Sequence, residues 1–86
     1  MNWNLLVTKS ARKELARLPS RDQQRIEAAL YEIAGNPFSG DIKRLQPDGW
    51  RRRVGNYRIF YDLYVDELRI VVTAIKRRTS STYFNP

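Results

Sequence analysis

Apolar residues near the start of the chain form one strand-like run and then adopt the spacing of a helix. The run Trp3–Val7 predicts a short β-strand. Three apolar residues then recur at intervals of four and three: Ala11, Leu15 and Leu18. This spacing predicts a helix from about Ser10 to Leu18. Pro19 ends it, because proline lacks the backbone N–H that a continuing helix needs.

A second helix is predicted to begin at Ser20. Ser20 and Gln23 have the spacing of a capping box, in which two side chains satisfy free backbone N–H groups of the first turn. A full apolar stripe follows, made of Ile26, Ala29, Leu30 and Ile33. The Gly-Asn-Pro segment at 35–37 ends the helix. The two helices should form an αα-hairpin whose apolar faces require a cover.

The second half of the chain is expected to supply that cover as strands. Phe38–Asp48 is predicted to be a loop, with Ile42 and Leu45 docked inward. Three strands follow, joined by turns at 55–56 and 65–67: Trp50–Val54, Arg58–Tyr64 and Leu68–Lys76. The last is apolar on both faces, which is typical of a central strand. We therefore expect a single α+β domain over residues 1–86, with an N-terminal strand, an αα-hairpin and a curved three-stranded antiparallel sheet covered by helices on one face.

Side chains alternate across a strand, so position assigns each one to the helix side or to the open side. The residues expected on the helix side are Trp50, Val54, Ile59, Tyr61, Leu63, Ile70, Val72 and Ala74. Four arginines from three neighbouring strands then converge on the open side, namely Arg51, Arg53, Arg58 and Arg77. Like charges side by side destabilise a sheet, so such a cluster favours a polyanionic partner. Arg52 falls on the helix side, where we expect its stem to be buried and its guanidinium to reach water at the sheet edge.

Charge and composition narrow the chemistry. The chain has 16 Lys and Arg against 9 Asp and Glu, a formal net charge of +7, which favours RNA, DNA or an acidic protein as partner. It has no cysteine and no histidine, which excludes disulfides, makes zinc very unfavourable and removes the commonest general base. No cofactor is expected. No apolar run approaches the roughly 18 residues of a membrane span, and no signal peptide is apparent, so a cytoplasmic protein is expected.

The segment Trp50–Tyr61, WRRRVGNYRIFY, resembles the central pattern of the RelE/ParE superfamily of type II toxins. That pattern is an aromatic residue, alternating basic residues, a glycine turn, then Tyr-Arg and an apolar strand. The preceding helix pair and the final strand with its basic end also match. The resemblance implies a toxin that a cognate antitoxin holds inactive. Its RelE-like branch cleaves messenger RNA, commonly on the ribosome, and so inhibits translation.

By motif position, the resemblance carries catalytic roles onto Arg51, Arg53, Arg58, Arg77 and Tyr83, with weaker RNA-binding roles for Lys43, Arg44, Lys76 and Arg78. Metal-free cleavage uses the ribose 2′-OH as nucleophile, and arginines suit the phosphate oxygens. We expect Arg58 and Arg77 to hold the scissile phosphate. RelE-like enzymes often have lysines where this chain has Arg51 and Arg53, and arginine does not readily give up a proton. Tyr83 is therefore the best candidate for proton transfer, ahead of Lys76 and Asp62.

Two alternative functions differ in class from a ribonuclease. A ParE-like toxin shares the fold but inhibits DNA gyrase without nuclease activity, and the presence of both Arg77 and Tyr83 argues against it. A non-toxic RNA-binding module stays open because arginines replace the lysines. An assay of message cleavage, run beside an assay of gyrase supercoiling, distinguishes the first alternative from a ribonuclease. Unaffected growth on expression without a partner would favour the second.

Overall fold

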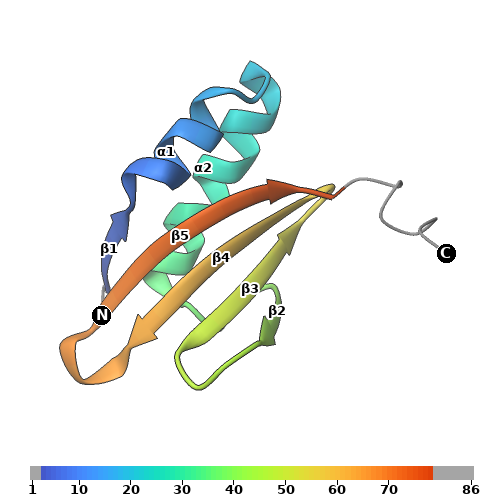
Figure 1. Ribbon diagram of the computed structural model, residues 1–86. Coiled ribbons are helices and arrows are strands. Elements are labelled where there is room, and N and C mark those ends of the chain that lie inside the picture. The colour runs from blue at the N-terminus through green and yellow to red at the C-terminus, as the bar shows by residue number, and fades with distance from the viewer. Residues whose placement is uncertain (1–2, 79–86) are drawn as a thin grey trace, which may run out of the picture.

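The chain folds into two α-helices and one five-stranded sheet in the computed structural model, which describes residues 3–78 (Figure 1). The helices are α1 (Lys9–Ala16) and α2 (Ser20–Gly35), and the short 3-10 helix η1 (Val65–Glu67) joins the last two strands. The strands are β1 (Asn4–Val7), β2 (Asp41–Arg44), β3 (Gly49–Val54), β4 (Tyr57–Tyr64) and β5 (Arg69–Arg77). Within these described residues, neither helix is long and apolar enough to cross a membrane.

The sheet is mixed and has the order β1-β5-β4-β3-β2. β1 runs parallel to β5, and every other pair of neighbours is antiparallel. The α+β class and the antiparallel unit β3-β4-β5 are therefore confirmed. β5 lies between β1 and β4, as its apolar faces predicted.

The sheet is wider than predicted, because Asp41–Arg44 forms β2 inside the segment expected to be a loop. This strand contains a single apolar residue, so no alternating pattern marks it in the sequence, and backbone pairing with β3 defines it. Ile42 is partly buried, as expected. Leu45 is 47% exposed, so the prediction that it docks inward is wrong.

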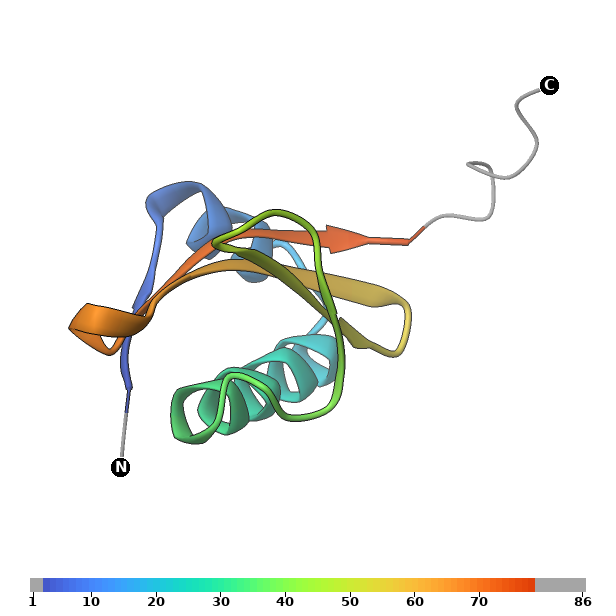
Figure 2. The ribbon, with the colours of Figure 1, turned by 90° about the horizontal axis from the view of Figure 1, so that it is seen from below.

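α2 lies against one face of the sheet, inside its curvature (Figure 2). Its predicted stripe of Ile26, Ala29, Leu30 and Ile33 is buried. The sheet side chains that pack in the same core are also buried: Ile59, Tyr61, Leu63, Ile70, Val72 and Ile75. Burying one large apolar side chain contributes about 1.5–3 kcal/mol, so this layer is the main source of stability. The face turned toward the viewer in Figure 1 is opposite α2, and we call it the open face.

α1 lies beside β5, just beyond the point where β1 ends (Figure 1). Thr8 makes the connection, because its N–H donates to the carbonyl of Val72 at 3.0 Å and its side chain accepts from the N–H of Ala11 at 3.3 Å. The second bond caps the start of the helix. α1 therefore covers the edge of β5 that β1 leaves unpaired.

The junction between the helices differs from the predicted capping box. Pro19, not Ser20, is the N-cap of α2, and it makes no side-chain cap bond. The side chain of Gln23 instead donates to the carbonyls of Ala16 and Leu18, at 3.2 and 2.9 Å. These carbonyls lie at the end of α1, where helix geometry leaves them without a partner. Gln23 thus stabilises the end of the first helix and not the start of its own.

A β-bulge in β5 changes which of its side chains face α2. Tyr61 of β4 pairs with Val72, whereas the preceding residue of β4 pairs with Ala74, which leaves Thr73 as an extra residue. The alternation restarts after Thr73. Ile75 is consequently buried, at 3% exposed, and Ala74 lies on the open face. The predicted inward position of Ala74 and outward position of Ile75 are therefore wrong.

Candidate nucleic-acid interface

Three basic side chains stand side by side on the open face. Arg53 of β3 lies opposite Arg58 of β4, which lies opposite Lys76 of β5. Residues directly opposite on neighbouring strands share a face, with Cβ atoms about 4.5–5.5 Å apart. An acidic residue stands at each end, because Asp41 of β2 lies opposite Arg53 and Glu14 of α1 binds Lys76. We call Arg53, Arg58 and Lys76 the basic row.

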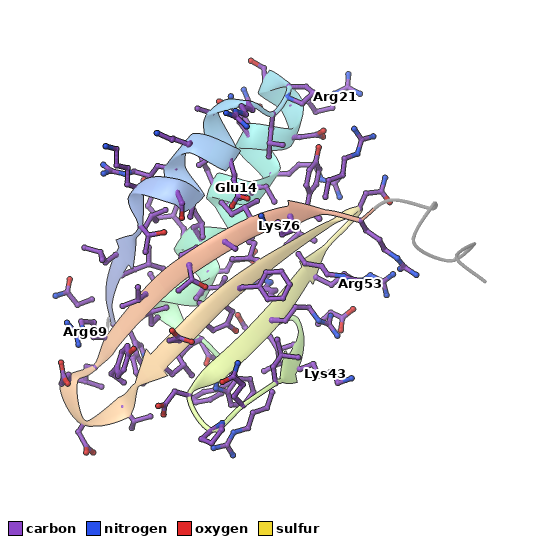
Figure 3. The ribbon with its side chains drawn as sticks, viewed as in Figure 1. Glu14, Arg21, Lys43, Arg53, Arg69 and Lys76 are labelled. Atoms are coloured by element: carbon purple, nitrogen blue, oxygen red, sulfur yellow. The ribbon has the colours of Figure 1, made fainter. Side chains whose placement is uncertain are left out.

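Two more cations lie on the same face, one step along the strands. Lys43 of β2 lies opposite Arg51 of β3, and Arg51 lies opposite Phe60 of β4. Arg51 and Asp41 form an ion pair at 3.9 Å. Lys43 and the two arginines of the basic row make no hydrogen bond or ion pair within residues 3–78. Their charges are available to a ligand, and the side chains of Lys43 and Arg53 extend away from the sheet in Figure 3.

Glu14 holds Lys76 in place. Its carboxylate accepts from Nζ of Lys76 at 2.5 Å and from the backbone N–H of Ile75 at 2.9 Å. Burial alone would raise the pKa of Glu14, but these bonds and the charges of Lys76 and Arg17 outweigh burial and lower the pKa below 4.5. The Lys76 side chain remains 60% exposed, so its ammonium group is positioned yet accessible (Figure 3).

Arg77 does not lie on the open face, contrary to the prediction from alternation. The bulge at Thr73 turns it toward the α2 side, where it lies opposite the buried Tyr57. The Tyr57 hydroxyl donates to Asp22 of α2 at 2.7 Å. This bond, burial and the charge of Asp22 raise the pKa of Tyr57, against the opposing charge of Arg77. Lys76 takes the open-face position that alternation assigns to Arg77.

Arg52 is buried under the sheet and does not reach water at an edge. It is 9% exposed, its guanidinium pairs with Glu32 of α2, and Nη1 donates to the Ser39 hydroxyl at 3.4 Å. β2 lies outside β3, so Arg52 is not at the edge of the sheet. Gly40 lies against the guanidinium with φ +80°, and a Cβ there would approach Nε to 2.7 Å. Arg52 therefore fixes the β2 segment and α2 to the sheet.

The remaining predicted site residues lie apart from the basic row. Arg44 stacks on the helix-side ring of Trp50, with its guanidinium carbon 5.8 Å from the ring centroid. Arg78 ends the described chain, and its backbone N–H donates to the Asn56 carbonyl at 2.6 Å. Tyr83 lies outside the described residues. Arg51, Arg53, Arg58, Lys43 and Lys76 are thus the predicted residues that the structure brings together.

The role of Glu14 had no signal in the sequence. It contacts a strand 62 residues away, and a local pattern cannot reveal such a contact. The sequence also did not show that Lys76, and not Arg77, lies on the open face. The bulge that causes this lies in a run of β-branched and small residues, where no residue marks it. Within the described part of the chain, no group of three or more His, Cys, Asp or Glu side chains is placed to hold a metal ion.

Comparison with known proteins places this arrangement in a family. A relative in Methanocaldococcus jannaschii, named as a candidate toxin, RelE1, is 30% identical over an alignment that spans both chains completely. A chain of the archaeal RelE–RelB complex from Pyrococcus horikoshii OT3 is similar at TM-score 0.82 and 23% identity, covering 93% of this chain and 99% of that one. The isolated Escherichia coli RelE toxin gives 0.79 and 22%, covering 94% and 90%.

The family model described as the ParE toxin of the type II toxin-antitoxin system parDE matches residues 5–81, which include both helices, four whole strands and all of β1 but its first residue. Sequence and fold therefore agree, and this chain belongs to the RelE/ParE family of type II toxin-antitoxin toxins.

Proposed function

We propose that this toxin is an endoribonuclease that cuts messenger RNA, on the ribosome, and so stops translation. The basic row carries the proposal: three cations at strand spacing on a face that no described helix covers. An RNA backbone presents a comparable series of negative charges, and neutralising them is the main sequence-independent source of affinity. Lys43 and Arg51 extend the charged surface along the strands.

The proposed reaction needs no cofactor. The ribose 2′-oxygen attacks the adjacent phosphorus, the bond to the 5′-oxygen breaks, and the products end in a 2′,3′-cyclic phosphate and a 5′-hydroxyl. Negative charge grows on the phosphate oxygens during attack. Arg58, at the centre of the row, and Lys76 beside it are the proposed ligands of that phosphate. Fixed donors of this kind are worth about 10²–10³ in rate each.

Proton transfer falls to groups other than arginine. An ammonium group can donate a proton to the departing 5′-oxygen, and Lys76 presents one beside Arg58, oriented by Glu14. Tyr83 is the second proposed participant and rests on its sequence position alone. With Lys76 as acid, a phenolate at Tyr83 would be the base for the 2′-OH.

A matched pair of variants tests the proposal. Arg58→Ala removes a charge from the basic row, and Arg69→Ala removes the same charge at the far end of the sheet, where Arg69 stacks on Tyr64 at 4.9 Å (Figure 3). In purified translation reactions, we expect Arg58→Ala to lower message cleavage about 100-fold. Arg69→Ala should stay within about threefold of wild type. Equal activity of all three proteins, or no cleavage by wild type, would refute the ribonuclease function.

The second candidate function is inhibition of DNA gyrase, favoured by the match to the ParE toxin model. It would use the same basic face to contact a protein or DNA and would require no catalytic set. Supercoiling assays beside cleavage assays, with wild type and Arg58→Ala, separate the two. Loss of supercoiling without cut messages would favour gyrase inhibition.

A cognate antitoxin is the proposed protein partner, in line with the RelE–RelB complex that the fold resembles. An apolar groove of about 590 Å³ runs between β1, α1 and α2, and its lining includes Trp3, Leu5, Val7, Leu15, Leu30, Tyr31 and Ala34. Tyr31 is 81% exposed there. An amphipathic antitoxin helix suits this groove, and an acidic segment suits the open face. Because the proposed targets are messages and ribosomes, the proposed activity is cytoplasmic.

A further inference from the structure

A small hollow opens on the open face beside the cations. It encloses about 220 Å³ between the end of β2 and the middle of β4 and β5. Its lining includes Leu45, Gln46, Gly49, Phe60, Asp62, Thr73 and Ala74. Phe60 lies directly opposite Arg51, so the hollow adjoins the proposed phosphate-binding surface. Pockets for drug-sized ligands measure about 300–1,000 Å³, so this one suits a single planar ring system.

Asp62 is the one acidic side chain in that lining. It is partly buried, yet its carboxylate makes no hydrogen bond or ion pair within residues 3–78. A Cβ at Gly49 would stand 3.6 Å from Oδ1, an ordinary van der Waals contact, so the carboxylate lies against the backbone of Gly49. An unsatisfied, partly buried carboxylate is unfavourable, and a ligand with N–H groups would satisfy it.

We propose that this hollow binds one base of the RNA substrate and selects guanine. The inference rests on the proposed ribonuclease function and assigns its base specificity to a named side chain. The ring of Phe60 and the exposed Leu45 offer the surfaces against which a base can pack. Asp62 offers two oxygens that only accept hydrogen bonds. Guanine matches them with two parallel donors, the N1–H and the 2-amino group.

The other bases match less well. Adenine and cytosine each present one amino group beside a ring nitrogen whose lone pair repels a carboxylate. Uracil presents one N–H between two carbonyl oxygens. Inosine is the sharpest probe, because it keeps the N1–H of guanosine and lacks the 2-amino group. A well-placed bidentate contact contributes discrimination of about fivefold or more.

The experiment measures binding separately from cleavage. Single-stranded RNA oligonucleotides with 2′-fluoro sugars cannot be cut by the proposed route, and they would differ at one central base: guanine, hypoxanthine, adenine, cytosine or uracil. Wild type should bind the guanine oligonucleotide at least about fivefold more tightly than the other four. Asp62→Asn should remove that preference. Asp48→Asn, which removes the same charge from an exposed turn residue outside the hollow, should retain it.

Three results would overturn the proposal. The first is equal affinity of wild type for the guanine and hypoxanthine oligonucleotides. The second is a guanine preference that survives both Asp62→Asn and Asp62→Ala, with thermal unfolding confirming that each variant is folded. The third is an Asp62→Asn protein that binds RNA unchanged but loses antitoxin affinity, which would assign the hollow to a cationic side chain of that partner. A clear guanine preference without message cleavage would instead refute the ribonuclease function alone.

Discussion

The ammonium group of Lys76 and the carboxylate of Glu14 lie 2.5 Å apart and join the end of β5 to α1. The same carboxylate accepts the backbone N–H of Ile75 through its other oxygen. One acidic side chain therefore satisfies the strand edge and orients a cation on the open face. Stability and the proposed function are coupled at this point.

The first prediction concerns Glu14. Glu14→Ala should lower the free energy of unfolding at pH 7 by about 1 kcal/mol, because a charged hydrogen bond to an exposed partner and a backbone bond are both lost. Glu14→Gln keeps an acceptor for Ile75 and should lose less. The pKa of Glu14 is lowered in the folded chain, so its contribution is present above pH 4.5 and is lost as the pH falls through the folded value. Urea titrations at pH 7 and pH 3 should show the difference between wild type and Glu14→Gln shrinking in acid.

The second prediction concerns Asp62, where removing the charge should stabilise the fold, whereas removing Glu14 should destabilise it. Burial, together with the charge of Asp48, raises the pKa of Asp62 above 3.8, so the folded state disfavours the ionised form. Asp62→Asn should therefore raise the melting temperature at pH 7. The gain should disappear as the pH falls toward 3.8, where wild type becomes protonated. A lower melting temperature at pH 7 would mean that the carboxylate has a stabilising partner. A gain would indicate that an unfavourable side chain is kept for binding.

The third prediction concerns the ion pair between the buried guanidinium of Arg52 and the largely exposed carboxylate of Glu32. Glu32→Ala leaves a buried guanidinium without its counter-charge and should lower the free energy of unfolding by about 2 kcal/mol. Glu27→Ala, on an exposed position of the same helix, is the matched control and should change it by less than about 0.5 kcal/mol. Adding Arg52→Met to Glu32→Ala should restore part of the loss, because the unpaired charge is gone. Additive losses in chemical denaturation would argue against coupling between the two side chains.

The fourth prediction follows from the bulge. Lys76→Ala should lower message cleavage at least tenfold, because Lys76 and not Arg77 faces outward beside Arg58. Tyr83→Phe should also lower it at least tenfold if the phenol transfers a proton. Arg77→Ala, measured alongside, reports what a charge at the end of the sheet contributes. Cleavage by Lys76→Ala at the wild-type rate would remove Lys76 from the proposed site.

Local patterns predicted the layers of the fold well. The stripe of α2 repeats at helical spacing and is buried as predicted, because a helix with one apolar side has a single stable orientation on a sheet. The positions of Arg51, Arg53 and Arg58 were also predictable, because β3 and β4 pair without interruption over these residues. Regular alternation is reliable wherever the register is regular.

Features that depend on a distant partner were not predictable. β2 exists because β3 offers backbone groups to pair with, and its own four residues do not favour a strand. The bulge at Thr73 reversed the predicted faces of Ala74, Ile75 and Arg77. The burial of Arg52 required Glu32 from another element. Arg52 and Glu32 are 20 residues apart, so no local pattern could reveal their contact.

The way α1 covers β5 bears on self-association. An open strand edge is a template on which a second copy of a chain can add its own strand and begin to aggregate. Within residues 3–78, one edge of this sheet is the four-residue β1 followed by the Glu14 carboxylate on Ile75, and the other is the four-residue β2, with Asp41, Lys43 and Arg44. Short, covered or charged edges disfavour such templating. The edges of this sheet therefore disfavour strand pairing between two copies of the toxin when no antitoxin is bound.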